Sequence, residues 1–190
     1  MVKKFILSTL IIISIPLFII LLNINSTFYN EIEEHQDLDD FFNQDQPLSD
    51  DYTEKEKTHL QEIKDLLAKS SYIVSITFIL ITLSSLFLVK IEKTKLLNSI
   101  STGTTLTLII TLIFIFLSTI DFSNFFTGFH ILTFETNNWL LDSSTKLIQT
   151  FPLTYFQEII QNLLTVIVFQ AIALILILKI LKKGIKNNFN

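Results

Sequence analysis

The sequence has no cysteine, no arginine, and only three glycines and three prolines in 190 residues. Without cysteine the chain cannot form a disulfide bond, a thiolate metal site or a cysteine nucleophile. All fourteen basic residues are lysines. A phosphate or carboxylate can therefore not be bound by the bidentate hydrogen bonds that an arginine guanidinium forms. Because 49% of the residues are hydrophobic, the composition is typical of an integral membrane protein.

Several catalytic and binding motifs are also missing. The chain contains no GxSxG nucleophile elbow, no HExxH zinc helix and no phosphate-binding loop. The acid-rich run from Glu31 to Glu56 lacks the spacing and glycine of a calcium loop, so we expect a solvated cap and no metal site. His35 lies in this charged run, and we expect it to be solvated.

Long apolar segments dominate what is present. Four of them are about long enough to cross a bilayer core, at residues 5–22, 71–89, 103–120 and 159–181. For the first, a cleaved signal peptide is the alternative, but residues 23–26 offer no small-x-small cleavage site and favour an uncleaved helix. The apolar segments hold no Asp, Glu, Lys or His near their middle, and no internal repeat is visible, which disfavours an ion pump or coupled transporter.

These segments predict the fold class and the location. We expect an all-α integral membrane protein, a single membrane domain over residues 1–190 with four transmembrane helices and a small helical cap. Lysines cluster at the N-terminus, between the second and third segments, and at the C-terminus. The positive-inside rule therefore predicts a multi-pass protein of the cell membrane with cytoplasmic N- and C-termini, and extracytoplasmic segments 23–70 and 121–158.

The first extracytoplasmic segment contains an amphipathic helix that we expect to begin near Tyr52, because apolar residues then recur at helical spacing. Either Asp51 or Thr53 is a suitable capping residue. Glu56 stands three residues after Thr53, as a capping box requires.

Two histidines, His59 and His130, fall in the two segments predicted to face the same side of the membrane. An imidazole can accept and return a proton near neutral pH, or act as a nucleophile. Glu62, Asp121 or Asp142 can orient one ring, as a carboxylate does in a catalytic triad. The alternatives are a surface histidine on an acidic helix and an interfacial histidine packed under aromatic side chains, and two histidines specify a zinc site only weakly.

At these two stretches the sequence resembles a known family. Residues 129–156 match the pattern FH-x3-F-x4-W-x2-D followed by FP-x2-[FY]F, and residues 56–64 match E-x2-H-[LM]-x-[DE]-[VI]-K. Both patterns are those of the four-helix membrane family that includes the lipoprotein intramolecular transacylase, Lit. One departure is Glu62, where the family pattern leads us to expect Asp, one methylene shorter.

The resemblance implies a reaction. The substrate would be a bacterial lipoprotein whose N-terminal cysteine carries a thioether-linked diacylglyceryl group. The enzyme, an acyltransferase, would move the sn-2 acyl chain to the α-amino group of that cysteine and give the lyso-form lipoprotein. His59 and His130 fall on the catalytic positions, one as a base or acyl relay and the other as an acid. Residues implied in positioning the substrate are Glu62, Lys64, Trp139, Asp142, Phe151 and Pro152.

The resemblance implies no cofactor and no metal. The expected partners are diacylglyceryl-modified lipoproteins and membrane lipids, with no nucleic acid, and we expect a monomer. A different class of function is a non-enzymatic membrane module whose acidic extracytoplasmic cap binds a partner protein or an ion. A third hypothesis is another lipid-ester enzyme, such as a lipase, which would release free fatty acid.

Overall fold

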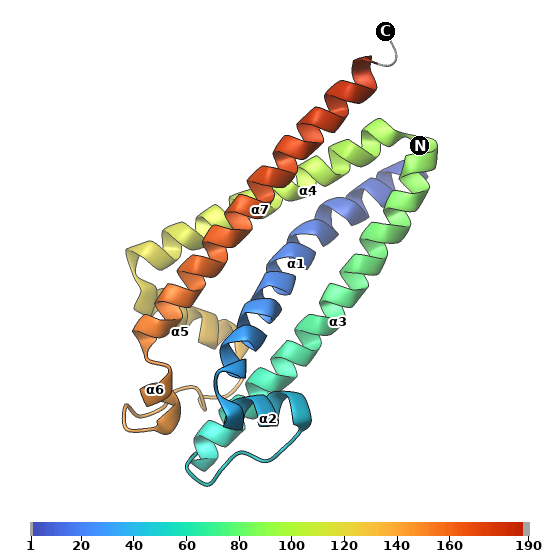
Figure 1. Cartoon of the computed structure of the whole chain (residues 1–190). Coiled ribbons are helices and arrows are strands. Elements are labelled where there is room, and N and C mark those ends of the chain that lie inside the picture. Colours follow the sequence, from blue (N-terminus) through green and yellow to red (C-terminus); the bar gives the residue numbers. More distant parts are fainter. Residues whose placement is uncertain (1, 188–190) are drawn as a thin grey trace. The chain divides into compact units, whose positions relative to one another are not determined.

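The computed structural model describes residues 2–187, which form α-helices joined by turns and loops and contain no strand in that range (Figure 1). The long helices are α1 (Val2–Glu33), α3 (Glu54–Ile91), α4 (Lys93–Ile120) and α7 (Leu153–Asn187). The short helices are α2 (Gln36–Gln44), α5 (Phe122–Thr133) and α6 (Lys146–Thr150). Each long helix contains an apolar stretch long enough to cross a membrane, so the predicted all-α fold with four spans is confirmed.

The long helices extend beyond the apolar segments that predicted them. α1 continues past residue 22 to Glu33, and α7 begins at Leu153, ahead of residue 159. α3 joins the amphipathic helix and the second span into one helix. A hydropathy pattern marks only the part of a helix that is apolar, whereas the polar residues that flank these segments are also compatible with a helix.

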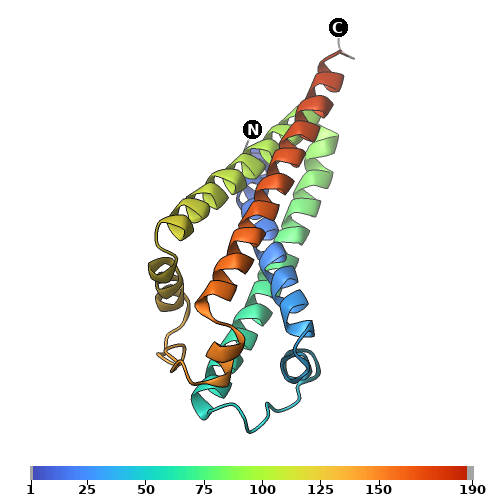
Figure 2. The same ribbon diagram turned by 60° about the vertical axis from the view of Figure 1, so that its left-hand side comes forward.

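The chain divides into two compact units. The membrane unit comprises Met1–Asn23, Ser71–Phe114 and Leu164–Asn190, and the cap unit comprises Ile24–Ser70 and Ile115–Leu163. All four long helices, seen from a second direction in Figure 2, contribute residues to both units.

In the membrane unit, α1 and α4 approach each other closely. A Cβ atom added to Gly103 of α4 would lie 3.0 Å from the Cβ of Ile15 and 3.2 Å from the carbonyl oxygen of Ile12. The hydroxyl groups of Ser8 and Ser99 are 2.6 Å apart between the same two helices. Small residues commonly permit such close packing of membrane helices.

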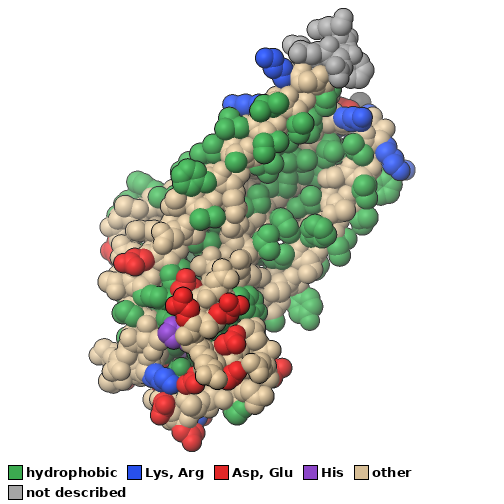
Figure 3. All heavy atoms as spheres, in the orientation of Figure 1, with side chains coloured by type: hydrophobic (Ala, Val, Ile, Leu, Met, Phe, Trp, Pro, Cys, Tyr) green, Lys and Arg blue, Asp and Glu red, His purple; other side chains and the backbone are tan. Residues whose placement is uncertain are grey.

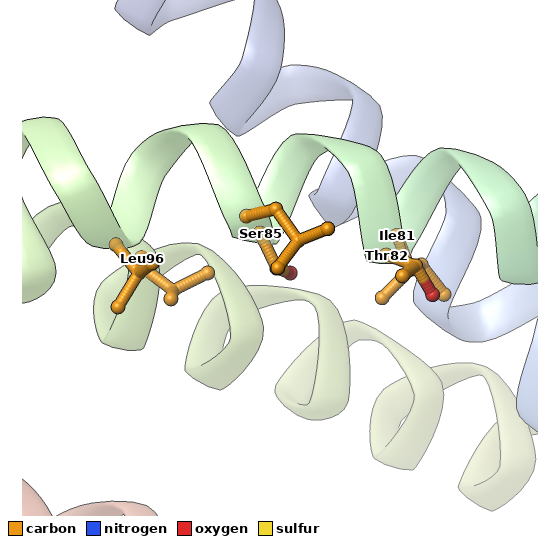
Figure 4. A pocket seen from close by; sticks show the side chains of 6 residues that line it. Ile81, Thr82, Ser85 and Leu96 are labelled. Carbon is orange, nitrogen blue, oxygen red and sulfur yellow. The ribbon is translucent and has the colours of Figure 1, made fainter.

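The surface of the membrane unit is apolar. Hydrophobic side chains cover much of its long helices in Figure 3, as expected for a protein whose solvent is lipid. A groove of about 390 Å³ lies between α3 and α4, and Figure 4 shows residues that line it. They are Ile81, Thr82, Ser85, Leu86, Val89 and Leu96. None of these side chains titrates, so the groove lacks the groups that acid–base chemistry requires.

The cap unit has a hydrophobic core of its own. Its buried members are Ile32, Leu38, Phe41, Phe42, Leu48, Tyr52, Leu60, Leu67, Leu147 and Phe151. They come from α1, α2, the segment after α2, α3, α6 and the residue that ends α6. This core packs segments that are far apart in the sequence around the start of α3.

The expectation that His35 is solvated was wrong in part, because the residue is half-buried. His35 precedes α2, and its imidazole packs edge-on against the ring of Phe151, with 4.8 Å between centroids. Its neighbours along the chain are charged, but the fold places it beside an aromatic residue from the other segment of the cap unit. A local sequence pattern does not contain that contact.

Candidate functional site

The cap unit brings the two predicted histidines together. His59 lies near the start of α3 and His130 near the end of α5, with 5.9 Å between their ring centroids. Both are buried, with exposed fractions of 5% and 8%. This observation disagrees with the alternative of a surface histidine at position 59.

Local capping interactions place both histidines. The main-chain N–H of Thr53 donates to the carboxylate of Glu56 at 2.7 Å, and the N–H of Glu56 faces the Thr53 hydroxyl at 3.3 Å. The capping box at Thr53 is therefore confirmed, and it starts α3 about two turns before His59. α5 is capped by Asp121, whose carboxylate accepts the main-chain N–H of Asn124 at 3.0 Å.

The protonation of His130 follows from its hydrogen bond. Nδ1 of its ring lies 2.8 Å from the main-chain carbonyl oxygen of Phe126. A carbonyl oxygen only accepts hydrogen bonds, so Nδ1 carries the hydrogen and Nε2 of the neutral ring keeps its lone pair. Burial lowers the pKa of His130, although the bond to Phe126 opposes this. The ring is therefore a neutral base near pH 7.

His59 faces a carboxylate. Its Nδ1 lies 3.5 Å from Oε2 of Glu62, one helical turn further along α3. Burial lowers the pKa of His59, and the nearby Glu62 opposes the shift. Of the three carboxylates considered from the sequence, Glu62 is thus the one beside a ring. Asp121 caps α5 instead, and Asp142 is exposed.

The second oxygen of Glu62 is held by the segment after α5. Oε1 accepts hydrogen bonds from the Thr136 hydroxyl at 2.6 Å and from the Asn138 side-chain amide at 3.2 Å. Burial alone would raise the pKa of Glu62, but the bonds from Thr136, Asn138 and His59 outweigh it and lower the pKa. Glu62 is therefore ionised at neutral pH.

Aromatic side chains surround the two imidazoles. The ring of His130 lies 4.2 Å from that of Phe126, 5.1 Å from Trp139 and 5.5 Å from Phe134, measured between centroids. Phe134 also packs edge-on against His59 at 4.9 Å. Trp139, which the resemblance implies in positioning the substrate, thus lies beside His130. Such a wall lowers the local dielectric and strengthens charge interactions within it.

Three other predicted site residues make scaffold contacts. Lys64 bonds to the main-chain carbonyl of Phe41 and to Asp45, and so ties α2 to α3. Phe151 is buried in the cap core. Pro152 precedes α7, and its carbonyl accepts the N–H of Tyr155 at 2.9 Å.

Glu56 also anchors the first turn of α6. Its Oε1 accepts the main-chain N–H of Leu147 at 2.7 Å, and the residue has no exposed surface. Burial alone would raise its pKa, but the bonds from Leu147 and Thr53 outweigh it and lower the pKa. Lys55 adds a bond to the carbonyl of Leu140. The start of α6 and the segment before it are thereby tied to the first turn of α3.

Sequence reasoning assigned no role to four residues of this site: Phe126, Phe134, Thr136 and Asn138, although Phe134 is a position of the family pattern. The polar run TNN at residues 136–138 was a visible signal in a mostly apolar chain. Its partner on α3 was not visible, because the contact joins segments far apart in the sequence. Among residues 2–187, no group of three or more His, Cys, Asp or Glu side chains could hold a metal ion.

The comparisons with known proteins agree on one family. The family model described as lipoprotein intramolecular transacylase Lit matches residues 36–156. The in meso structure of the membrane integral lipoprotein intramolecular transacylase Lit from Bacillus cereus is 20% identical, with a TM-score of 0.75 over 96% of this chain and 97% of that chain.

Two variants of the Bacillus cereus protein match as well. One has a histidine replaced by arginine, with 19% identity and a TM-score of 0.73 over 97% of this chain and 94% of that chain. The other has a histidine replaced by alanine, with 19% identity and a TM-score of 0.72 over 96% and 95%. A search of curated proteins finds no match.

Proposed function

This chain belongs to the family of the lipoprotein intramolecular transacylase Lit, and we propose that His59 and His130 carry out its acyl transfer. It is a multi-pass membrane enzyme that acts on lipoproteins. The observation that carries the residue assignment is the buried histidine pair. In each ring Nδ1 lies near a hydrogen-bond acceptor. Nδ1 therefore carries the hydrogen, and Nε2 of the neutral ring has a free lone pair.

The proton balance of the reaction calls for two bases. The α-amino group of a peptide has a pKa of about 8 and is mostly an ammonium ion at neutral pH. Forming the amide removes two protons from this nitrogen, the ester C–O bond breaks, and the departing glyceryl oxygen gains one proton. One proton is released overall. Two neutral imidazoles can accept the two protons, and one of them then protonates the glyceryl oxygen.

The two histidines differ in how well each holds a positive charge. The Glu62 carboxylate stabilises an imidazolium at His59, as the carboxylate of a triad does. We therefore assign to His59 the first proton, which leaves the ammonium. His130, whose partner is an uncharged carbonyl, forms the less stable imidazolium and is the better acid. It takes the second proton as the nitrogen attacks and delivers it to the glyceryl oxygen.

The aromatic wall suits an intramolecular transfer. Trp139, Phe134 and Phe126 contact the histidine pair and keep water away from the ester carbonyl. Exclusion of water favours attack by the neighbouring amine over hydrolysis, because the amine belongs to the same substrate molecule. The product is then an N-acyl lipoprotein and not a free fatty acid.

We assign the site to the extracytoplasmic face and both termini to the cytoplasm, on the distribution of the lysines. The substrate is a lipoprotein with a diacylglyceryl cysteine, drawn from the surrounding lipid. Residues 1–190 act as one membrane domain and one monomer. The shared helices support the single domain, since each long helix contributes to both compact units.

Mass spectrometry of a purified reaction tests this assignment. The substrate is a synthetic peptide with an N-terminal diacylglyceryl cysteine, and wild-type protein should convert it to an isobaric product with one acyl chain on nitrogen. His59→Ala and His130→Ala should each abolish conversion while the protein remains helical. Release of free fatty acid by wild-type protein would indicate a lipase, and full activity of either variant would overturn the roles of the histidines.

A further inference from the structure

Residues 136–139, which we call the clamp segment, contact both catalytic histidines or their partners. Thr136 and Asn138 bond to Oε1 of Glu62, whose other oxygen faces His59. Trp139 lies against the ring of His130. The main-chain N–H of Asn138 also donates to the Thr136 hydroxyl at 3.3 Å, so the two contacts to Glu62 are linked to each other.

The distances show which contacts hold Glu62 in place. Nδ1 of His59 is 3.5 Å from the carboxylate, at the outer limit of a hydrogen bond. The Thr136 bond, at 2.6 Å, is much shorter, and the Asn138 bond adds a second donor at 3.2 Å. A glutamate side chain has three rotatable bonds, and the His59 contact alone is too weak to fix them. The clamp segment supplies the fixed point.

We propose that Thr136 and Asn138 are positioning residues for acyl transfer: they hold Glu62 so that its free oxygen keeps His59 as the Nδ1–H tautomer, with Nε2 directed to the substrate. This inference rests on the proposed function of His59. Within residues 2–187, the titratable groups that act on the His59 charge are Glu62 and His130. The state of His59 therefore depends on the orientation of Glu62.

The first test observes His59 directly, without substrate. Protein labelled with 15N-histidine contains three histidines, and NMR reports the tautomer and titration of each. Thr136→Val removes the hydroxyl and keeps the shape of the side chain. We expect it to lower the pKa of His59 and to increase the share of its Nε2–H tautomer, while His130 is unchanged.

Two substitutions act as controls in the same segment. Thr136→Ser keeps the hydroxyl and should give the wild-type spectrum. Asn137 has an exposed side chain, and its main-chain carbonyl, which bonds to Leu140, survives substitution. Asn137→Ala should therefore also leave His59 unchanged. A wild-type tautomer and titration of His59 in both Thr136→Val and Asn138→Leu would overturn the proposal.

The second test is kinetic and uses the diacylglyceryl peptide. We expect Thr136→Val to lower kcat about tenfold, equivalent to about 1.4 kcal/mol, with little change in KM. The acid limb of its pH profile should move to lower pH, because a less favourably placed carboxylate no longer raises the pKa of His59. Glu62→Gln should lower kcat at least as much. A purely structural role would instead lower the melting temperature without moving the pH profile.

The outcomes separate this inference from the proposed function. If wild-type protein forms no N-acyl product, the transacylase assignment of the histidines fails, while the NMR experiment still decides whether the clamp segment controls His59. If wild-type protein is active and Thr136→Val and Asn138→Leu both retain its kcat and pH profile, the clamp proposal alone is wrong.

Discussion

The Glu56 carboxylate offers a quantitative test of what holds the cap unit together. Glu56→Ala removes the capping box with Thr53 and leaves the buried N–H of Leu147 without its acceptor. Loss of a helix cap costs about 0.5–2 kcal/mol, and an unsatisfied buried donor costs about 1–3 kcal/mol. We therefore expect the free energy of unfolding of the cap unit to fall by roughly 1.5–5 kcal/mol.

The single tryptophan provides the assay. Trp139 lies in the cap unit, between α5 and the α6 helix that Glu56 anchors, so its fluorescence during urea unfolding in detergent reports on the cap unit. Glu54→Ala is the matched control: it lies in the same turn, and its side chain is 91% exposed beside Lys57. Exposed ion pairs of this kind contribute up to about 1 kcal/mol, so the control should stay near wild type. Equal unfolding midpoints for Glu56→Ala and Glu54→Ala would refute the reasoning.

Two further predictions concern pH and helix packing. Burial lowers the pKa of both His59 and His130 below 6.5. Their contribution to the stability of the fold is therefore present above pH 6.5 and is lost as the pH falls through the folded-state pKa values. We expect activity to be lost over the same pH range. A pH titration of Trp139 fluorescence and of kcat checks this, and a constant kcat well below the folded-state values would contradict it. Gly103→Ala places a methyl group 3.0 Å from the Cβ of Ile15 and should lower the melting temperature. Gly184 has open space around it, so Gly184→Ala should leave the melting temperature unchanged. An equal fall in melting temperature for both variants would contradict this prediction.

The features that the sequence predicted are those encoded over short distances. Apolar length predicted the four spans, and the three-residue spacing of Thr53 and Glu56 predicted the start of α3. The chemistry of imidazole and the expected topology made His59 and His130 candidates, and the family pattern implied their roles. Each of these predictions needs only a single stretch of chain or a charge count.

The features that escaped prediction depend on contacts between distant segments. Glu62 meets Thr136 and Asn138 across the cap unit, and no periodicity in either segment encodes that pairing. The same reason accounts for His35, whose aromatic partner comes from the end of α6. The family pattern located Lys64, but its bonds to Phe41 and Asp45 could be known only from the fold.

The rings of His59 and His130 differ in how easily mutation can disturb their hydrogen-bond partners. The acceptor for His130 is the main-chain carbonyl one turn earlier on α5, and every amino acid at position 126 supplies the same carbonyl. The surroundings of His130 can therefore drift without altering its tautomer. His59 depends on side chains at positions 62, 136 and 138. Mutations at these distant codons must compensate one another, so this half of the site should accumulate change only as a coordinated set.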